Sequence, residues 1–147
     1  MLIESIHSLA EVTPLLAEGA LPTSDISASP LPLFFGVREN GKLVGVVGLE
    51  LYPPVGLLRS LAVTPNHRGR RLAQALVAHV EAVGISRHVT SLYLLTTTAE
   101  PFFAKLGYGP AARATAPEAI RITPQFTGLC PASAAFMVKA LRAKGAG

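Results

Sequence analysis

The segment LLRSLAVTPNHRGRRLAQALVA, residues 57–78, decides the fold of this chain. The apolar run Leu57–Val63 predicts a strand, Thr64–His67 predicts a turn, and the basic residues Arg68–Arg71 lead directly into a helical pattern. Backbone N–H groups and a helix N-terminus therefore converge beside clustered guanidinium groups, an arrangement that binds a phosphate or a pyrophosphate. The alternative is an ordinary strand, turn and helix with a solvated basic turn.

The composition is that of a folded globular chain with one core. Of the 147 residues, 50% are hydrophobic and 15% are charged, which suits a single domain over residues 1–147. No apolar run is long enough to span a bilayer, and the first residues lack the basic start of a signal peptide. We therefore expect a cytoplasmic protein with no membrane partner. The single cysteine, Cys130, fits a reducing compartment.

The formal net charge of +4 raises the question of a nucleic-acid partner. The cations form no long run, and their densest cluster is the basic turn itself, at His67, Arg68, Arg70 and Arg71. Aromatic residues make up only 6% of the chain, which leaves little surface for stacking bases. An anionic small molecule explains the cluster more economically, so we expect no nucleic-acid partner. The spacing of the four histidines predicts no metal site.

Hydrophobic patterning outside this segment predicts a sheet. The dipeptide Asn40-Gly41 separates two apolar runs, Leu33–Glu39 and Lys42–Leu51, and is a strong signal for a β-hairpin. The other predicted strands are Leu2–Ile6, Val89–Thr96, Tyr108–Arg113 and Ala134–Leu141.

Helical periodicity predicts a first helix that begins after Ser8 or, alternatively, has Pro14 as its first residue. The central helix is expected to run from Arg68 to Val83 and to end at Gly84, because glycine commonly follows a helix. A shorter helix is expected over Ala99–Leu106.

The segment LLRSLAVTPNHRGRRLAQAL resembles the acyl-coenzyme A segment of the GNAT N-acetyltransferases, with Arg68 and Ala73 at the first and last positions of the family's loop pattern. The segment LYLLTTTAEPFFAKLGY resembles the fifth strand and fourth helix of the same fold. The resemblance implies an α/β (α+β) fold, with a mixed central sheet of about six to seven strands flanked by helices. It also implies a splay between the fourth and fifth strands, where the acyl arm of the cofactor inserts.

This resemblance implies acetyl-CoA as the cosubstrate and no metal. A backbone N–H on the fourth strand would polarise the thioester carbonyl, and the pyrophosphate would lie over the N–H groups of the loop. The implied cofactor-binding residues are Leu61, Ala62 and Val63 on the strand, and Arg68, Gly69, Arg70, Arg71, Leu72 and Ala73 at the loop and helix. Arg71 stands where the family usually has Gly, so its side chain either crowds the pyrophosphate or binds it.

Polar residues near the fourth strand are the candidates for the chemistry. Glu50, in apolar company, either accepts the amine proton as the catalytic base or faces solvent at the end of its strand. Arg59 must find an anion, which is either a carboxylate of the substrate or an internal partner, Glu50 or Asp25. Ser60 is the second candidate catalytic residue, unless its hydroxyl is satisfied on the backbone.

The remaining substrate-binding candidates are Asp25, which would orient the substrate with Arg59, and Thr96 and Thr97, whose hydroxyls end the fifth strand. For the threonines the alternative is a helix start capped by Thr98. The acid that protonates the leaving thiolate has no candidate. Many relatives have a tyrosine in the fourth helix where this chain has Phe103, which has no proton to donate.

A closer resemblance covers most of the chain. The segments YLLTTT (93–98), FFAKLGY (102–108), APEAI (116–120) and LCPAS (129–133) resemble the arsenic-resistance-associated N-acetyltransferase subfamily. This resemblance implies an N-acetyltransferase whose substrate is a small-molecule amine, either an amino acid or an organoarsenical analogue of one. The alternative is a catalytically degenerate acyl-CoA-binding module, which the residues Arg71 and Phe103 motivate. The apolar run Ala134–Leu141 either pairs across a homodimer or ends the sheet of a monomer.

Overall fold

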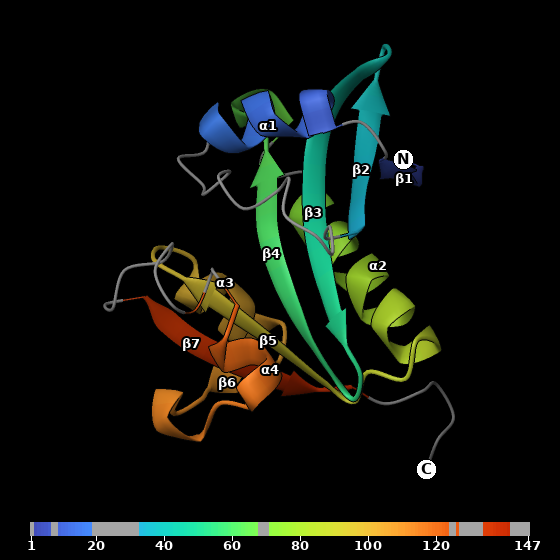
Figure 1. The fold of residues 1–147 in the computed structure, drawn as a ribbon. Coiled ribbons are helices and arrows are strands. Elements are labelled where there is room, and N and C mark those ends of the chain that lie inside the picture. Colours follow the sequence, from blue (N-terminus) through green and yellow to red (C-terminus); the bar gives the residue numbers. More distant parts are fainter. Residues whose placement is uncertain are drawn as a thin grey trace. The chain divides into compact units, whose positions relative to one another are not determined.

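A sheet of seven strands organises this chain in its computed structural model (Figure 1). The structure describes residues 2–6, 9–18, 33–67, 71–123, 126 and 134–141. The strands are β1 (Ile3–Ile6), β2 (Leu33–Glu39), β3 (Lys42–Tyr52), β4 (Val55–Val63), β5 (Ser91–Thr96), β6 (Gly109–Pro110) and β7 (Ala135–Ala140). Their order in the sheet is β1-β2-β3-β4-β5-β7-β6. The expected mixed sheet flanked by helices is confirmed.

The helices are α1 (Leu9–Glu18), α2 (Leu72–Ser86), α3 (Glu100–Lys105) and α4 (Glu118–Arg121), with short 3₁₀ turns η1 (Pro65–His67) and η2 (Arg113–Thr115). Among the residues described, no helix has the length and apolar character needed to cross a bilayer. The chain divides into two compact units, Met1–Glu50 with Leu58–Val80 and Leu51–Leu57 with Glu81–Gly147. Each unit has a hydrophobic cluster of its own. The expectation of a single domain stays a prediction.

The hairpin between β2 and β3 is confirmed at the residues that predicted it. Asn40 and Gly41 both have positive φ angles, 54° and 78°, which a two-residue turn of the primed type requires. β2 pairs antiparallel with β3 on one side and with β1 on the other. A second tight turn at Pro53 and Pro54 returns the chain from β3 to β4, which run in opposite directions (Figure 1).

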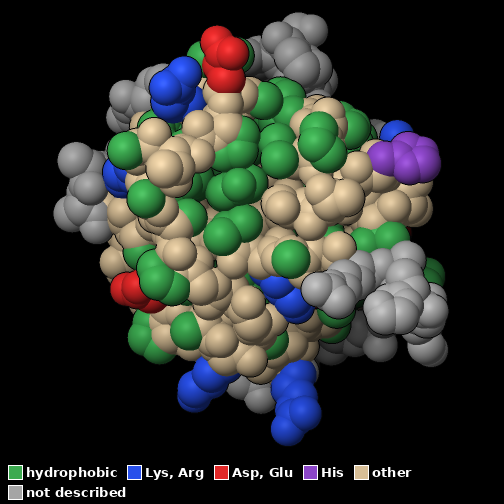
Figure 2. All heavy atoms as spheres, turned by 90° about the horizontal axis from the view of Figure 1, so that it is seen from below, with side chains coloured by type: hydrophobic (Ala, Val, Ile, Leu, Met, Phe, Trp, Pro, Cys, Tyr) green, Lys and Arg blue, Asp and Glu red, His purple; other side chains and the backbone are tan. Residues whose placement is uncertain are grey.

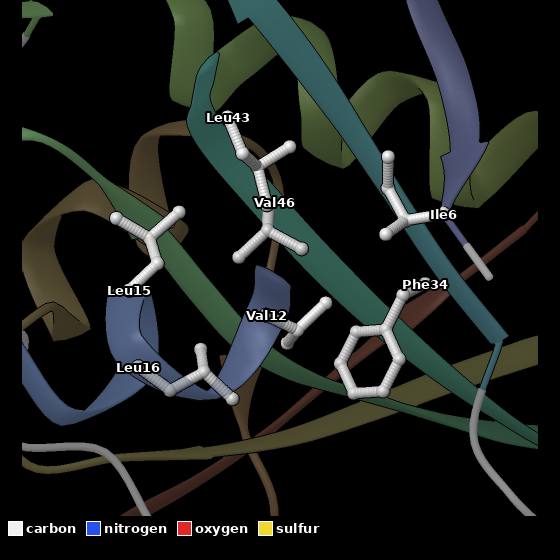
Figure 3. Close-up of a cluster of buried hydrophobic side chains, with 7 residues drawn as sticks. All are labelled: Ile6, Val12, Leu15, Leu16, Phe34, Leu43 and Val46. Carbon is white, nitrogen blue, oxygen red and sulfur yellow. The ribbon is translucent and has the colours of Figure 1, made fainter. Parts of the chain in front are cut away.

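A helix covers each face of the sheet in the unit that contains α1. On one face, α1 and the strands form a cluster of buried side chains (Figure 3): Ile6, Val12, Leu15, Leu16, Phe34, Leu43 and Val46. On the other face, α2 approaches β3 closely at Gly45, where an added Cβ would lie 3.1 Å from the Leu72 side chain. Strand alternation explains the two layers, because Phe34 joins the α1 cluster whereas the Phe35 ring contacts His79 of α2.

Pro14 lies inside α1, so the alternative in which it begins the helix is wrong. An interior proline costs a helix about 3 kcal/mol, because it removes a hydrogen bond and its ring crowds the preceding turn. Val12, Leu15 and Leu16 are 0%, 7% and 0% exposed, and the burial of each such side chain contributes about 1.5–3 kcal/mol. The burial of this helix face therefore outweighs the cost of the proline. Ser8 lies outside the described residues.

β4 and β5 run parallel and are paired over a short length. Their ladder joins Val55–Leu57 to Ser91–Tyr93, whereas β4 extends to Val63 and β5 to Thr96. The expected splay beyond this ladder stays a prediction. β5 then pairs antiparallel with β7, and β7 pairs antiparallel with the two-residue strand β6.

The central helix α2 differs from its prediction at both ends. It begins at Leu72 instead of Arg68, and it continues through Gly84 to Ser86. Gly84 is buried, and an added Cβ there would lie 3.3 Å from the side chain of Leu141. The glycine therefore provides room for packing and does not end the helix.

Two residues after the end of α2, His88 has a φ of 68°. The N–H of Val89 donates to the carbonyl of Gly84 over 2.9 Å, and the N–H of His88 donates to the carbonyl of Ile85 over 3.2 Å. These two bonds form a Schellman motif, in which a left-handed residue satisfies the last carbonyls of a helix. Glycine is the residue best suited to that position, and this chain has histidine there.

The variant His88→Gly is expected to stabilise the protein by about 1 kcal/mol, because glycine adopts a positive φ without the steric cost of a Cβ. His88 is exposed, so the substitution removes little packing. Urea denaturation measures the change in the free energy of unfolding. His88→Ala is the matched control, since it removes the imidazole but keeps the Cβ. Equal gains in both variants would contradict the explanation.

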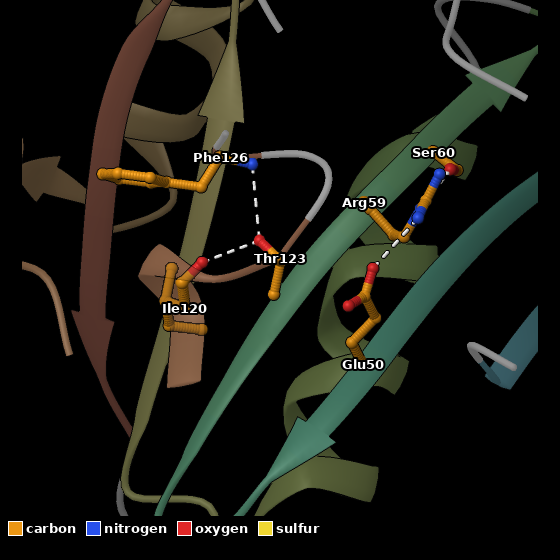
Figure 4. Close-up of polar contacts among 6 residues, drawn as sticks. All are labelled: Glu50, Arg59, Ser60, Ile120, Thr123 and Phe126. Carbon is orange, nitrogen blue, oxygen red and sulfur yellow. Dashed lines mark hydrogen bonds and ion pairs between the residues drawn. The ribbon is translucent and has the colours of Figure 1, made fainter. Parts of the chain in front are cut away.

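An aromatic cluster forms the core of the second unit. Its buried centre consists of Leu57, Ile120 and Phe136. The Phe136 ring stacks on Tyr93 with centroids 5.4 Å apart and meets the Phe126 ring edge-on at 5.3 Å. The hydroxyl of Thr123 donates to the carbonyl of Ile120 over 2.7 Å and accepts from the N–H of Phe126 over 3.3 Å (Figure 4). These bonds hold the end of α4 against the cluster.

Candidate active site

A buried ion pair joins β3 and β4 at the centre of the predicted site. Nη1 of Arg59 lies 2.9 Å from Oε2 of Glu50, and the two side chains are 1% and 8% exposed (Figure 4). Of the alternatives for Arg59, the structure therefore contains the internal pair with Glu50. The alternative of a solvent-facing Glu50 is wrong, because β3 is buried on both faces from Leu43 through Glu50.

Ser60, the residue after Arg59, has a left-handed backbone with a φ of 60°. This conformation costs a residue with a Cβ about 1–2 kcal/mol. Nε of Arg59 donates a hydrogen bond to Oγ of Ser60 over 3.0 Å (Figure 4). The Ser60 hydroxyl therefore has a side-chain partner, in place of the expected backbone one.

Gly48 makes room for Arg59 beside the ion pair. An added Cβ on Gly48 would lie 3.1 Å from Cγ of Arg59 and 3.0 Å from the ring of Phe34. Both distances are too short for most real Cβ contacts, so only glycine leaves the Arg59 stem where it is. Gly48 was not among the residues predicted for the site. A glycine inside an apolar strand, two positions before Glu50, is a signal of such a close approach.

The residues expected to face the thioester carbonyl, Leu61, Ala62 and Val63, form the last part of β4 and are partly buried. Beyond them, the N–H of Thr64 donates to the carbonyl of Val44 over 2.9 Å, which ties this end of β4 to β3. Because the three residues follow directly on Ser60, the direction of their N–H groups depends on its left-handed conformation.

Only part of the predicted phosphate loop falls within the described residues, since Arg68, Gly69 and Arg70 lie outside them. Arg71 is exposed and has a φ of 60°, the conformation that glycine favours. The N–H of Ala75 donates to the carbonyl of Arg71 over 3.1 Å, so Arg71 immediately precedes the first turn of α2. Leu72 and Ala73 then contribute the first N–H groups of the helix.

His67 ties the turn before this loop to its neighbours. Its Nδ1 lies 2.7 Å from Oγ1 of Thr64, and its Nε2 lies 3.0 Å from Oε2 of Glu39. The geometry at Nε2 is not that of a hydrogen bond, so the contact with Glu39 is one of proximity. The imidazole thus links the turn after β4 to the end of β2.

Of the other substrate-binding candidates, Asp25 lies outside the described residues, and Thr96 and Thr97 belong to the compact unit that contains β5. Oγ1 of Thr96 accepts a hydrogen bond from the N–H of Ala99 over 3.0 Å. The alternative with Thr98 as the helix cap is wrong, because α3 begins after Ala99 without a side-chain cap. Thr97 is exposed at the end of the strand.

Phe103, at the position where many relatives have tyrosine, is 4% exposed and meets the Tyr108 ring edge-on. The Tyr108 hydroxyl donates to Oε2 of Glu81 over 2.9 Å, and Nζ of Lys139 lies 3.1 Å from both oxygens of that carboxylate. Burial raises the pKa of Tyr108 and the Glu81 carboxylate raises it further, so the phenol keeps its proton. Neither aromatic side chain is suited to protonate a thiolate.

Within the described ranges, no three His, Cys, Asp or Glu side chains gather to hold a metal ion. On the face drawn in Figure 2, Lys and Arg side chains stand apart from one another instead of forming a stripe. Of the predicted site residues, the structure brings together Glu50, Arg59 and Ser60. Arg71 stands at the start of α2.

Residues 3–108 match the acetyltransferase (GNAT) family. An amino-acid acetyltransferase of Ralstonia nicotianae (strain ATCC BAA-1114 / GMI1000) is 30% identical over 101 residues, which are 66% of this chain and 22% of that protein. N-acetylglutamate synthase from Neisseria gonorrhoeae, complexed with coenzyme A and L-arginine, has a TM-score of 0.79 at 20% identity, over 97% of this chain and 33% of that chain. Rv2747 from Mycobacterium tuberculosis, in complex with CoA and NLQ, has a TM-score of 0.77 at 17% identity, over 97% of this chain and 100% of that chain.

These comparisons cover the proteins unequally. The chain spans 22% of the Ralstonia enzyme and 33% of the Neisseria one. The likeness to the solved structures shows the fold, and two of the three proteins are named as an amino-acid acetyltransferase and an N-acetylglutamate synthase. None of the three names refers to arsenic, so the expected arsenic-resistance subfamily has no support from them.

Proposed function

Because the chain belongs to the acetyltransferase (GNAT) family, we propose that it transfers the acetyl group of acetyl-CoA to the amino group of a small molecule. The family match carries this proposal, since it spans β4, the loop and α2, the elements expected to hold the cofactor. In the reaction, the amine nitrogen bonds to the thioester carbonyl carbon and the C–S bond breaks. The amine loses a proton, and the thiolate takes one from solvent.

The start of α2 is the proposed site of the cofactor's pyrophosphate. Its first N–H groups and the exposed guanidinium of Arg71 provide the donors that such an anion needs. The structures of two relatives contain coenzyme A, which supports acetyl-CoA as the cosubstrate. Leu61–Val63 would then offer backbone N–H groups to the thioester oxygen, where negative charge develops during the transfer.

Glu50 is the proposed acceptor of the amine proton, directly or through a water molecule. Its carboxylate is buried on β3 and lies 2.9 Å from Nη1 of Arg59, the residue that precedes Ser60 and Leu61–Val63 in β4. Asp25, Thr96 and Thr97 stay predicted contacts of the acceptor. The acceptor that we propose is an amino acid, because the relatives are named for amino-acid acetylation. An organoarsenical analogue has no support beyond the resemblance of the sequence.

A second candidate function is acyl-CoA binding without turnover. The buried Phe103 favours it, because this side chain has no proton to give to the thiolate and the neighbouring Tyr108 keeps its own. Acetyl transfer without a protein acid is nevertheless feasible, since a thiolate is a good leaving group at neutral pH.

Mixing the protein with acetyl-CoA and a panel of amino acids is expected to release coenzyme A, which a thiol reagent measures and mass spectrometry of the product confirms. Glu50→Gln should lower kcat by about 10²-fold, because the amide cannot accept the proton. Glu4→Gln is the matched control, since Glu4 lies on β1 in a partly exposed pair with Arg38. If the protein binds coenzyme A tightly but sets no free thiol loose from acetyl-CoA with any amino acid of the panel, acyl-CoA binding without turnover is favoured instead.

A further inference from the structure

We propose that Arg59 is a positioning residue, which holds Ser60 in its left-handed conformation and so aims the backbone N–H groups of Leu61–Val63 at the thioester carbonyl. This inference rests on the proposed acetyl transfer and adds a role for the buried ion pair. According to this proposal, Ser60 contributes to the reaction through its left-handed backbone conformation. Its hydroxyl serves only to hold that conformation.

The backbone of Ser60 is the first observation behind this proposal. A φ of 60° within β4 places a non-glycine residue in a region that is rarely occupied. Such a residue persists only where its surroundings hold it, and residues of this kind cluster at functional sites. A single left-handed residue also turns the peptide groups that follow it in the strand. The groups that follow here are those assigned to the carbonyl.

The contacts of the guanidinium are the second observation (Figure 4). Nη1 lies 2.9 Å from the carboxylate of Glu50, and Nε donates to Oγ of Ser60 over 3.0 Å. Because the guanidinium is planar and rigid, the partner at one nitrogen fixes the direction of the other. The Arg59 side chain is 1% exposed, so its surroundings leave it little freedom. Glu50 therefore orients Arg59, and Arg59 orients the Ser60 side chain.

Gly48 supplies the third observation, from the other side of the arginine. Cγ of Arg59 lies where a Cβ on Gly48 would be only 3.1 Å away, and the Arg59 carbonyl would be 3.3 Å away. The absence of a side chain on β3 thus sets how closely Arg59 approaches that strand. The Ser60 side chain has one rotatable bond before its oxygen, so a fixed Oγ restricts the backbone of Ser60 as well.

A comparison of Ser60→Ala with Ser60→Gly tests the proposal. Both variants remove the hydroxyl and keep the Arg59–Glu50 pair, but only glycine adopts a positive φ without cost. We expect kcat of Ser60→Ala to be about tenfold below that of Ser60→Gly, a factor that corresponds to about 1.4 kcal/mol. The KM for acetyl-CoA should differ less, because the pyrophosphate donors lie elsewhere. Equal kcat values in the two variants would overturn the proposal.

Stability provides a second readout that does not depend on turnover. Ser60→Gly should have a higher melting temperature than Ser60→Ala. The same substitutions at Ser5, in β1 without a positive φ, should show the opposite order, because glycine weakens an ordinary strand. If the wild-type protein acetylates no amine, the proposed function fails. The order of melting temperatures at Ser60 then decides the conformational claim, and an unchanged or reversed order overturns it.

Discussion

Arg59→Met is expected to destabilise the protein by about 3–5 kcal/mol, because it leaves the Glu50 carboxylate buried without its guanidinium. The two side chains are 1% and 8% exposed, so water cannot replace the lost partner easily. Since domains of this kind have total stabilities of about 5–15 kcal/mol, the loss is a large fraction of the whole. Urea denaturation followed by circular dichroism measures it.

Arg38→Met is the matched control for this prediction. Nε of Arg38 also lies 2.9 Å from a glutamate oxygen, that of Glu4, but these side chains are 27% and 42% exposed. Such a solvated pair contributes less than about 1 kcal/mol. The double variant Glu50→Met/Arg59→Met removes both buried charges and should lose less stability than Arg59→Met alone. Similar losses for Arg38→Met and Arg59→Met would show that burial is not the cause.

Arg71→Gly is expected to raise the KM for acetyl-CoA by about tenfold or more while it stabilises the protein by about 1 kcal/mol. The affinity falls because a charge-assisted contact with phosphate contributes about 1.5–3 kcal/mol. The stability rises because Arg71 has a φ of 60°, which glycine adopts without steric cost. Steady-state kinetics and titration calorimetry with coenzyme A measure the first effect, and urea denaturation measures the second.

Two further variants separate the charge of Arg71 from its backbone. Arg71→Gln keeps the Cβ and loses the charge, so its KM should rise without a gain in stability. Arg71→Lys keeps the charge and should stay within about threefold of the wild-type KM, with the cofactor affinity falling as salt is added. A lower KM in Arg71→Gly would show that the guanidinium crowds the pyrophosphate, which was the other interpretation of this position.

Local patterns predicted the elements well. Asn40 and Gly41 specified the β-hairpin because their two positive φ angles are a property of the turn residues themselves. The strand after Leu57 and the helix that follows it were likewise visible in the hydrophobic pattern, and the basic turn between them lies mostly outside the described residues. Local rules left two starts open for the first helix, and packing decided between them, because the buried face of α1 outweighed the break at Pro14. Local rules failed at Gly84, which serves the contact with Leu141.

The candidate site was predictable by residue type but not by pairing. Sequence alone named Glu50 and Arg59 and allowed them either to meet each other or to meet a substrate. Their contact depends on the register of β3 against β4, which no local pattern reports. Ser60 gave no sign of its left-handed backbone, because serine occurs in many conformations and this one is held by a neighbouring side chain. The reason for a glycine at position 48 is visible only in the structure, where Arg59 lies too close to leave room for a Cβ.

The amino-acid sequence by itself determined the succession of strands and helices, the family of the chain and the positions around which a cofactor loop could form. The succession of elements follows from periodicity and turn chemistry, which act over a few residues. The family follows from the match over residues 3–108. Only the tertiary structure decided that the Arg59 guanidinium contacts the Glu50 carboxylate and the Ser60 hydroxyl. The sequence had left a carboxylate of the substrate as the other possible partner. A charged side chain that is buried on folding needs a partner of opposite charge, here on the neighbouring strand. Which partner it meets depends on how the two strands are aligned.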